Sequence, residues 1–82
     1  MGITAGQARA ARGLIGWSQD ELAAESGVGR ATIADFESGK RQPYETTLGK
    51  LSAALEKAGV EFIAENGGGP GVRLRKGKGE GE

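Results

Sequence analysis

The chain has 82 residues with no cysteine and no histidine, which excludes a disulfide framework, a Cys-based zinc site and His-based acid–base catalysis. Eleven Lys and Arg balance eleven Asp and Glu, so any contact with nucleic acid must rest on local clusters of cations. The apolar runs are too short to span a bilayer and no signal-peptide pattern opens the chain, so we expect a small cytoplasmic domain without cofactor, metal or membrane partner.

The first helix is predicted over residues 5–14. Thr4 followed by Gln7 forms a capping-box pattern at its start. Gly16 is a stop signal after its end. Gly13 lies inside the helical pattern, where glycine is unfavourable, and this predicts close packing of that position against another helix.

Two short helical patterns follow, separated by a glycine-bearing turn. A second capping box, Ser18 with Glu21, opens a helix that ends near residue 25. A turn at residues 27–29 precedes a third helix over residues 30–37. Two helices joined by such a turn are typical of a helix-turn-helix, whose second helix enters the DNA major groove.

A fourth helix is predicted from near residue 45 to Gly59, because Leu48, Leu51 and Leu55 form an apolar stripe. The stripe is too short for a coiled coil, and its leucines are assigned to the core. Residues 1–59 thus form the predicted helical domain.

The last third of the chain changes character. Alternating apolar residues predict two strands of a β-hairpin, at 60–64 and 72–76. The turn-dense segment 66–71 between them lacks the G-x-x-x-x-G-K-[ST] pattern of a phosphate loop. Residues 77–82 are of low complexity and are predicted to be disordered.

Residues 8–60 carry a combination of features that points to one family. They are Arg12, Ser18-Gln19, Leu22-Ala23, Ser26-Gly27-Val28, Ile33, Phe36 to Arg41, Pro43, Thr47-Leu48, Leu51 and Ala54-Leu55. This pattern resembles the Cro/C1-type helix-turn-helix family, also called the XRE family, of phage repressors and bacterial regulators. One departure is Gly29, where many members carry Ser or Thr at the start of the third helix.

The resemblance implies a mainly α fold, a lambda-repressor-like bundle of four or five helices, here followed by the predicted hairpin. It implies a sequence-specific DNA-binding transcriptional regulator, with repression the expected direction. Such a protein would bind double-stranded DNA at a two-fold-related operator as a homodimer and be encoded by a bacterium or phage.

The resemblance also implies roles for single positions. The base readers are Arg30, Ala31, Thr32 and Asp35. The phosphate contacts are Ser18, Gln19, Lys40 and Arg41. Arg12 and Glu37 are similar to a structural ion pair that ties the first helix to the end of the third. Among the readers, Arg30 is suited to bond O6 and N7 of guanine, while Asp35 accepts from cytosine N4 or orients Arg30.

Several of these positions keep a second interpretation. Gln19 alone is an ordinary exposed helix residue, and Lys40 with Arg41 has a solvated loop pair as its second interpretation, although we favour the phosphate contact. Arg30 is open to a phosphate contact only, and Asp35 to being a surface acid. The basic residues of the last segment are either a DNA-binding arm or a solvated strand face, which we favour; they are Arg73, Arg75, Lys76 and Lys78.

The hairpin suggests how two copies would meet. A two-stranded hairpin is marginal alone, and its exposed edges seek a partner. We therefore hypothesise that residues 60–76 form the dimerisation element, with apolar contacts from Val60, Phe62, Val72 and Leu74. The rival arrangement folds the hairpin back on its own helices and leaves dimerisation to the fourth helix.

A second function remains open from the sequence: the antitoxin of a toxin–antitoxin pair, which binds both operator DNA and a toxin protein. An enzyme has little support, because no nucleophile–base set, metal cluster or phosphate loop is visible. No catalytic residue is therefore predicted.

Overall fold

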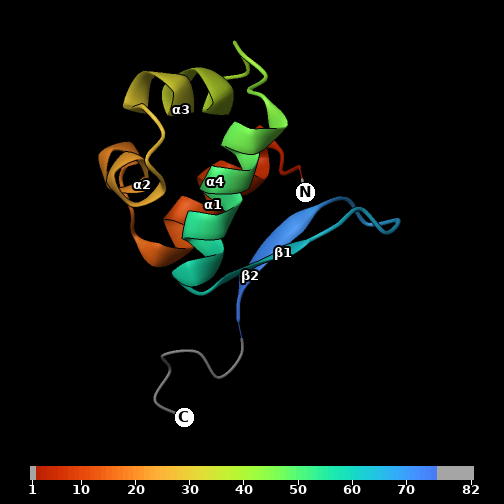
Figure 1. The fold of residues 1–82 in the computed structure, drawn as a ribbon. Helices are drawn as coiled ribbons and strands as arrows, with labels where there is room; N and C mark the ends of the chain where they lie inside the picture. The colour runs from red at the N-terminus through yellow and green to blue at the C-terminus, as the bar shows by residue number, and fades with distance from the viewer. Residues whose placement is uncertain (1, 76–82) are drawn as a thin grey trace.

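The computed structural model describes residues 2–75, and within them the fold is a four-helix bundle followed by a β-hairpin (Figure 1). The helices are α1 Ala5–Ile15, α2 Gln19–Ser26, α3 Arg30–Glu37 and α4 Glu45–Lys57. The strands are β1 Val60–Ile63 and β2 Gly71–Leu74. The prediction of a mainly α fold is confirmed. Of the four or five helices expected, residues 2–75 contain four. The tail predicted at 77–82 lies outside the described residues, as does residue 76.

Both predicted capping boxes are present. Thr4 Oγ1 accepts from the Gln7 N–H at 3.0 Å, and Ser18 Oγ accepts from the Glu21 N–H at 3.0 Å. In each box the third helical residue reciprocates by accepting the N–H of the cap residue. Gly16 stops α1 in the left-handed conformation at φ +71°, as predicted, and the last helical residue is Ile15, one residue later than predicted. The starts of α1 and α2 and the end of α1 therefore follow from local hydrogen bonding of the backbone ends.

A single hydrophobic core joins all four helices to the first strand. Its fully buried large side chains are Leu22, Ile33, Leu51, Leu55 and Val60. The core therefore continues past the end of α4 into the hairpin, across the boundary predicted at residue 59. Trp17, between α1 and α2, is half-buried and packs against the core.

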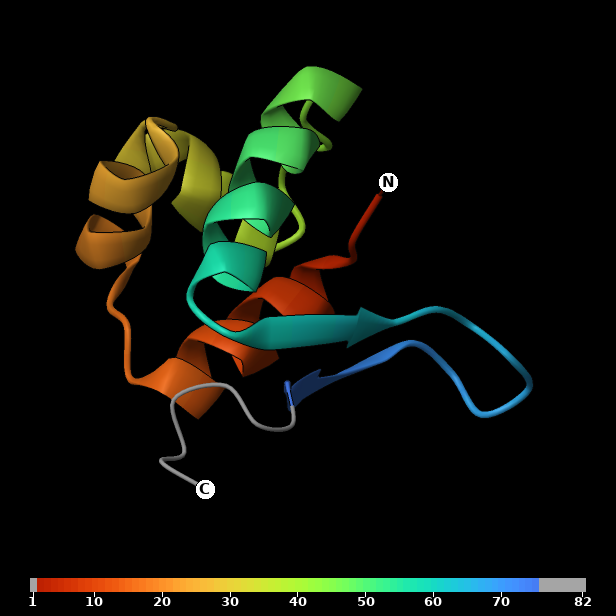
Figure 2. The same ribbon diagram turned by 60° about the horizontal axis from the view of Figure 1, so that its bottom comes forward.

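The hairpin lies against its own helix bundle (Figure 2). Its two strands are antiparallel, with Val60 opposite Leu74 and Phe62 opposite Val72. Val60 is fully buried, and Phe62 and Val72 are half-buried against the core. These three side chains stabilise the monomer by packing against its own helices, and their contact with a second copy stays a prediction. Of the four, Leu74 remains exposed, at 45%.

Gln7 ties the hairpin to α1. Its amide oxygen accepts the Thr4 N–H at 2.9 Å in the capping box. Its amide nitrogen donates to the carbonyls of Ile63 at 3.3 Å and Gly71 at 2.9 Å, one on each strand. The side chain is buried, and both ends of its amide are satisfied. One α1 residue thus holds the loop end of the hairpin, where β1 ends and β2 begins.

The close packing predicted at Gly13 is not found. A Cβ placed on this residue would meet no atom within 4 Å beyond its own helix, and the position is exposed. Gly16 is also open, but its positive φ disfavours any residue with a side chain.

We expect Gly13→Ala to raise the free energy of unfolding by about 1 kcal/mol, because alanine loses less backbone entropy in a helix. Gly16→Ala should lower it by about 1–2 kcal/mol, because alanine is strained in the left-handed region. Urea denaturation followed by circular dichroism measures both. A loss of stability in Gly13→Ala would mean that something packs on this position.

Candidate nucleic-acid interface

The turn between α2 and α3 is built from two glycines around one buried valine. Gly27 ends α2 at φ +77°, and its N–H donates to the Ala23 carbonyl at 2.9 Å. Val28 is 8% exposed and anchors the turn in the core. Gly29 begins α3 and supplies no side-chain cap. Because α3 has only 8 residues, its place depends on contacts with the other helices.

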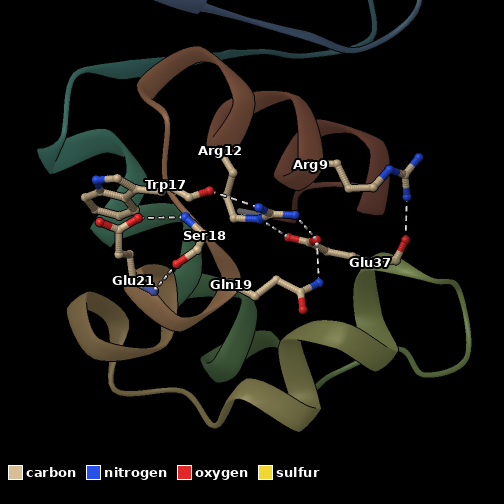
Figure 3. A network of polar contacts seen from close by, with 7 residues as sticks. All are labelled: Arg9, Arg12, Trp17, Ser18, Gln19, Glu21 and Glu37. Atoms are coloured by element: carbon tan, nitrogen blue, oxygen red, sulfur yellow. Dashed lines mark hydrogen bonds and ion pairs between the residues drawn. The ribbon is translucent and has the colours of Figure 1, made fainter.

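Glu37, the last residue of α3, is held by side chains from α1 and α2 (Figure 3). Arg12 of α1 makes a two-point contact with its carboxylate, Nε to Oε2 at 2.9 Å and Nη2 to Oε1 at 2.6 Å. Gln19 of α2 donates its amide N–H to Oε1 at 3.0 Å. Arg12 also donates to the Trp17 carbonyl at 2.9 Å, at the α1–α2 connection. One carboxylate therefore joins three helices.

The charges of this network are strongly coupled. Burial by itself would raise the pKa of Glu37, but hydrogen bonds from Arg12 and Gln19, with the positive charges of Arg12 and Arg9, bring it below the ordinary value. The pKa of Arg12 is raised, chiefly by its hydrogen bond to Glu37. Arg9 also donates to the Glu37 carbonyl, which places a cation at the C-terminal end of α3. The carboxylate is therefore ionised and fully paired at neutral pH.

The opposite side of α3 is open to solvent. Arg30 and Ala31 are exposed, whereas Thr32 and Asp35 are half-buried. Arg30 Nε pairs with Oδ1 of Asp20 on α2 at 2.9 Å, and these side chains are 61% and 77% exposed. Arg30 is thus oriented by Asp20 and not, as one of our predictions held, by Asp35. An ion pair this exposed contributes at most about 1 kcal/mol, so the guanidinium can exchange it for another acceptor.

Two cations lie on the loop after α3. Lys40 and Arg41 are exposed, while their backbone N–H groups donate to the Asp35 carbonyl at 2.8 and 3.2 Å. Gly39 turns the chain at φ +85°, and Pro43 is buried beyond it. The backbone of the loop is therefore held without help from the two cationic side chains.

An open hollow of about 410 Å³ separates α3 from the start of α4. It is lined by Thr32, Arg41, Gln42, Pro43, Tyr44 and Thr47. Tyr44 is 85% exposed, far more than a tyrosine usually is in a small domain. Sequence reasoning did not select it, although its place between a buried proline and the first residue of a helix marks it as the edge of this surface.

A family model described as helix-turn-helix matches residues 9–62, about two thirds of the chain. The chain belongs to the Cro/C1-type helix-turn-helix family. It is therefore a DNA-binding transcriptional regulator, of a family that is regulatory and not enzymatic. No curated protein gives a significant match.

Two of the residues predicted to contact phosphates, Ser18 and Gln19, use their side chains within the protein. The Gln19 amide N–H is turned to Glu37, and the Ser18 hydroxyl accepts a backbone N–H as the cap of α2. Both side chains therefore have structural partners in the free protein. What the start of α2 offers to an anion is its outward backbone N–H groups.

Two basic residues of the hairpin are occupied within the chain. Arg73 Nε bonds Glu61 Oε1 at 3.1 Å across the strands, and Arg75 donates to the Glu56 carbonyl at 2.6 Å. These contacts fit a solvated strand face better than a DNA-binding arm. Lys76 and Lys78 lie outside the described residues. Among residues 2–75, no helix is both long and apolar enough to cross a membrane.

We expect Arg12→Met to lower the free energy of unfolding by about 3–5 kcal/mol, because it leaves the buried Glu37 carboxylate without its counter-charge. The matched control is Arg30→Met, which breaks an exposed pair and should change stability by less than about 1 kcal/mol. Urea denaturation measures both. Equal losses would mean that the network does not hold the helices together.

The pKa of Glu37 also predicts a pH dependence. Since its pKa is lower in the folded chain, the unfolded chain binds more protons near the ordinary value of 4.5. The stability from this pair is therefore complete above that value and is lost as the pH falls through the folded-state pKa. In Glu37→Gln, which is less stable throughout, the fall in unfolding free energy below about pH 5 should be shallower than in the unaltered protein. Parallel pH profiles would contradict the assignment; Glu61, whose pKa is lowered by Arg73, contributes equally to both.

Proposed function

We propose that this protein is a sequence-specific transcriptional repressor that binds a two-fold-related operator as a homodimer. The observation that supports it best is the solvent-exposed face of α3. Lys40 and Arg41 lie beside this face, and the ion pair of Glu37 with Arg12 fixes the end of α3 to α1. Because the C-terminal end of α3 is anchored, its first turns are held in a fixed position on the domain surface. Insertion of a recognition helix into the major groove requires such a fixed position.

Base reading would fall to the start of α3. Arg30 exchanges Asp20 for O6 and N7 of a guanine, a contact worth about 1–3 kcal/mol of discrimination. Ala31 and the Thr32 methyl group are suited to contact a thymine methyl. Asp35 is half-buried and its carbonyl holds the following loop, so we give it the smallest share in base reading.

Phosphate contacts would hold the domain in register. Lys40 and Arg41 lie on one side of α3, and the backbone N–H groups at the start of α2 on the other. Because the chain carries no net positive charge, one copy offers few cations to the DNA backbone. Two copies on one duplex double the number of contacts, which supports a dimeric repressor.

The test begins with duplexes selected from a random-sequence pool by the purified protein. We expect an enriched motif with two-fold symmetry and half-sites about 10 base pairs apart. Placed over a promoter, this motif should reduce reporter expression when the protein is present. Failure to enrich any motif would contradict sequence-specific binding, and higher expression would contradict repression.

Single substitutions should separate reading from positioning. On the selected duplex, Arg30→Ala should relax preference at one position of each half-site. Lys40→Ala should weaken binding to all sequences and reduce the slope of log affinity against log salt by about one per lost phosphate contact, hence about two per dimer. The matched control is Lys57→Ala, at the far end of α4, which should leave both unchanged. If Lys57→Ala acts like Lys40→Ala, the assigned DNA-facing surface is wrong.

A further inference from the structure

The hydrogen-bond pattern of the hairpin decides which backbone groups it leaves unpaired. The Arg75 N–H donates to the Gly59 carbonyl at 2.7 Å, which makes 59 and 75 a hydrogen-bonded pair. Antiparallel pairs alternate, so Glu61 with Arg73 and Ile63 with Gly71 also face each other through their backbone groups. The intervening residues of β2, Val72 and Leu74, therefore turn their N–H and C=O groups away from β1.

The outer edge of β2 is the side of the strand that faces away from β1, and the hairpin does not pair its outward backbone groups. It presents donor and acceptor at Val72 and again at Leu74, two residues apart. The hairpin packs one face on α1 and α4, and within residues 2–75 the sheet ends at β2. A strand edge of this kind is a template for another strand.

Exposed apolar side chains lie beside the same edge. Leu14 and Leu74 are 43% and 45% exposed and are two of the three large apolar side chains so exposed in residues 2–75. α1 and β2 are in contact and run in the same general direction (Figures 1 and 2). Gln7 bonds Gly71, and seven helical residues advance about as far as three strand residues, roughly 10 Å. Leu14, seven residues after Gln7 and on the same side of α1, is therefore expected near the level of Leu74.

We propose that β2 pairs antiparallel with β2 of a second copy, across a two-fold axis at Arg73, to form a four-stranded sheet. This inference rests on the homodimer of the proposed function and assigns its interface. In this register, Val72 of each copy lies opposite Leu74 of the other, and four backbone hydrogen bonds form. An axis at Val72 would instead set Leu74 opposite Pro70, which has no N–H to donate.

The side chains suit this register. The face toward the helices brings together two Val72–Leu74 pairs, with Leu14 of each copy close by. On the other face, the two Arg73 side chains meet at the axis, and each is already paired with its own Glu61 at 3.1 Å. The like charges are thus compensated within each copy. The edge also lies away from α3, so that a dimer built on it leaves both DNA-facing surfaces open (Figure 1).

Cysteine cross-linking tests the register directly, because the chain has no cysteine of its own. In Arg73→Cys, the two thiols lie across the axis in a non-hydrogen-bonded pair, with Cα atoms about 4.5 Å apart, within disulfide reach. Mild oxidation of the native full chain should give a covalent dimer in high yield. The matched control is Glu61→Cys, on the same face but about 14 Å from its mate across three strand spacings, which should remain uncrosslinked. Equal cross-linking of both, or none at position 73, would overturn the proposal.

A second pair of variants separates the strand edge from its side chain. Leu74→Pro and Leu74→Thr both remove the leucine, but only proline removes the outward N–H that the hairpin itself does not use. Leu74→Pro should keep the circular dichroism spectrum and weaken dimerisation in sedimentation at least about thirtyfold beyond Leu74→Thr, because two intermolecular hydrogen bonds are lost. Equal dimerisation of the two variants would contradict the edge pairing.

The two hypotheses fail differently. A protein that is dimeric without cross-linking at position 73, yet binds the selected duplex, contradicts this interface alone. A protein that binds the selected duplex as a monomer contradicts the interface and the proposed homodimer, but not sequence-specific DNA binding. A protein that cross-links at position 73 but enriches no DNA motif supports the interface and contradicts the proposed function.

Discussion

The two-point contact between Arg12 and Glu37 is the interaction on which the DNA-facing surface depends. The Glu37 side chain is 3% exposed, and taking a carboxylate out of water is tolerated only when its oxygens are fully bonded. Here both oxygens are occupied by groups from α1 and α2, so the burial cost is offset only when three helices are in place together. The eight-residue α3, which has no side-chain cap at its start, acquires a fixed direction from this condition.

Much of the fold was predictable because its signals are local. The capping boxes at Thr4 and Ser18 and the helix-ending Gly16 act within one turn of the backbone, and each appears where the sequence indicates. The Arg12–Glu37 pair was expected only by resemblance, because no local pattern joins residues 25 positions apart. Alternation predicted the hairpin strands to within two residues, but not which surface covers their apolar face.

In the candidate site, too, some features follow from local sequence signals and others depend on packing between helices. The exposure of Arg30, Lys40 and Arg41 follows from helix periodicity and loop composition, and the structure places all three at the surface. Two further features depend on how α2 and α3 cross: the pairing of Arg30 with Asp20, and the turn of the Gln19 amide toward Glu37. Helix-to-helix geometry is set by packing, which a single sequence does not display. Gln19 therefore looks like a free surface residue in the sequence and is a structural one in the fold.

The contacts of Gln7 restrict which residue types this fold tolerates at position 7. At the third position of a capping box, glutamate and glutamine are usually interchangeable, because either can accept the cap N–H. Glu21 in the second box uses only that acceptor, and its side chain meets solvent. At Gln7, the amide nitrogen also donates to two strand carbonyls, so a carboxylate would bring its second oxygen against both. Two positions with the same local signature thus obey different substitution rules, and sequences that share this hairpin should be recognisable by an amide in the first box.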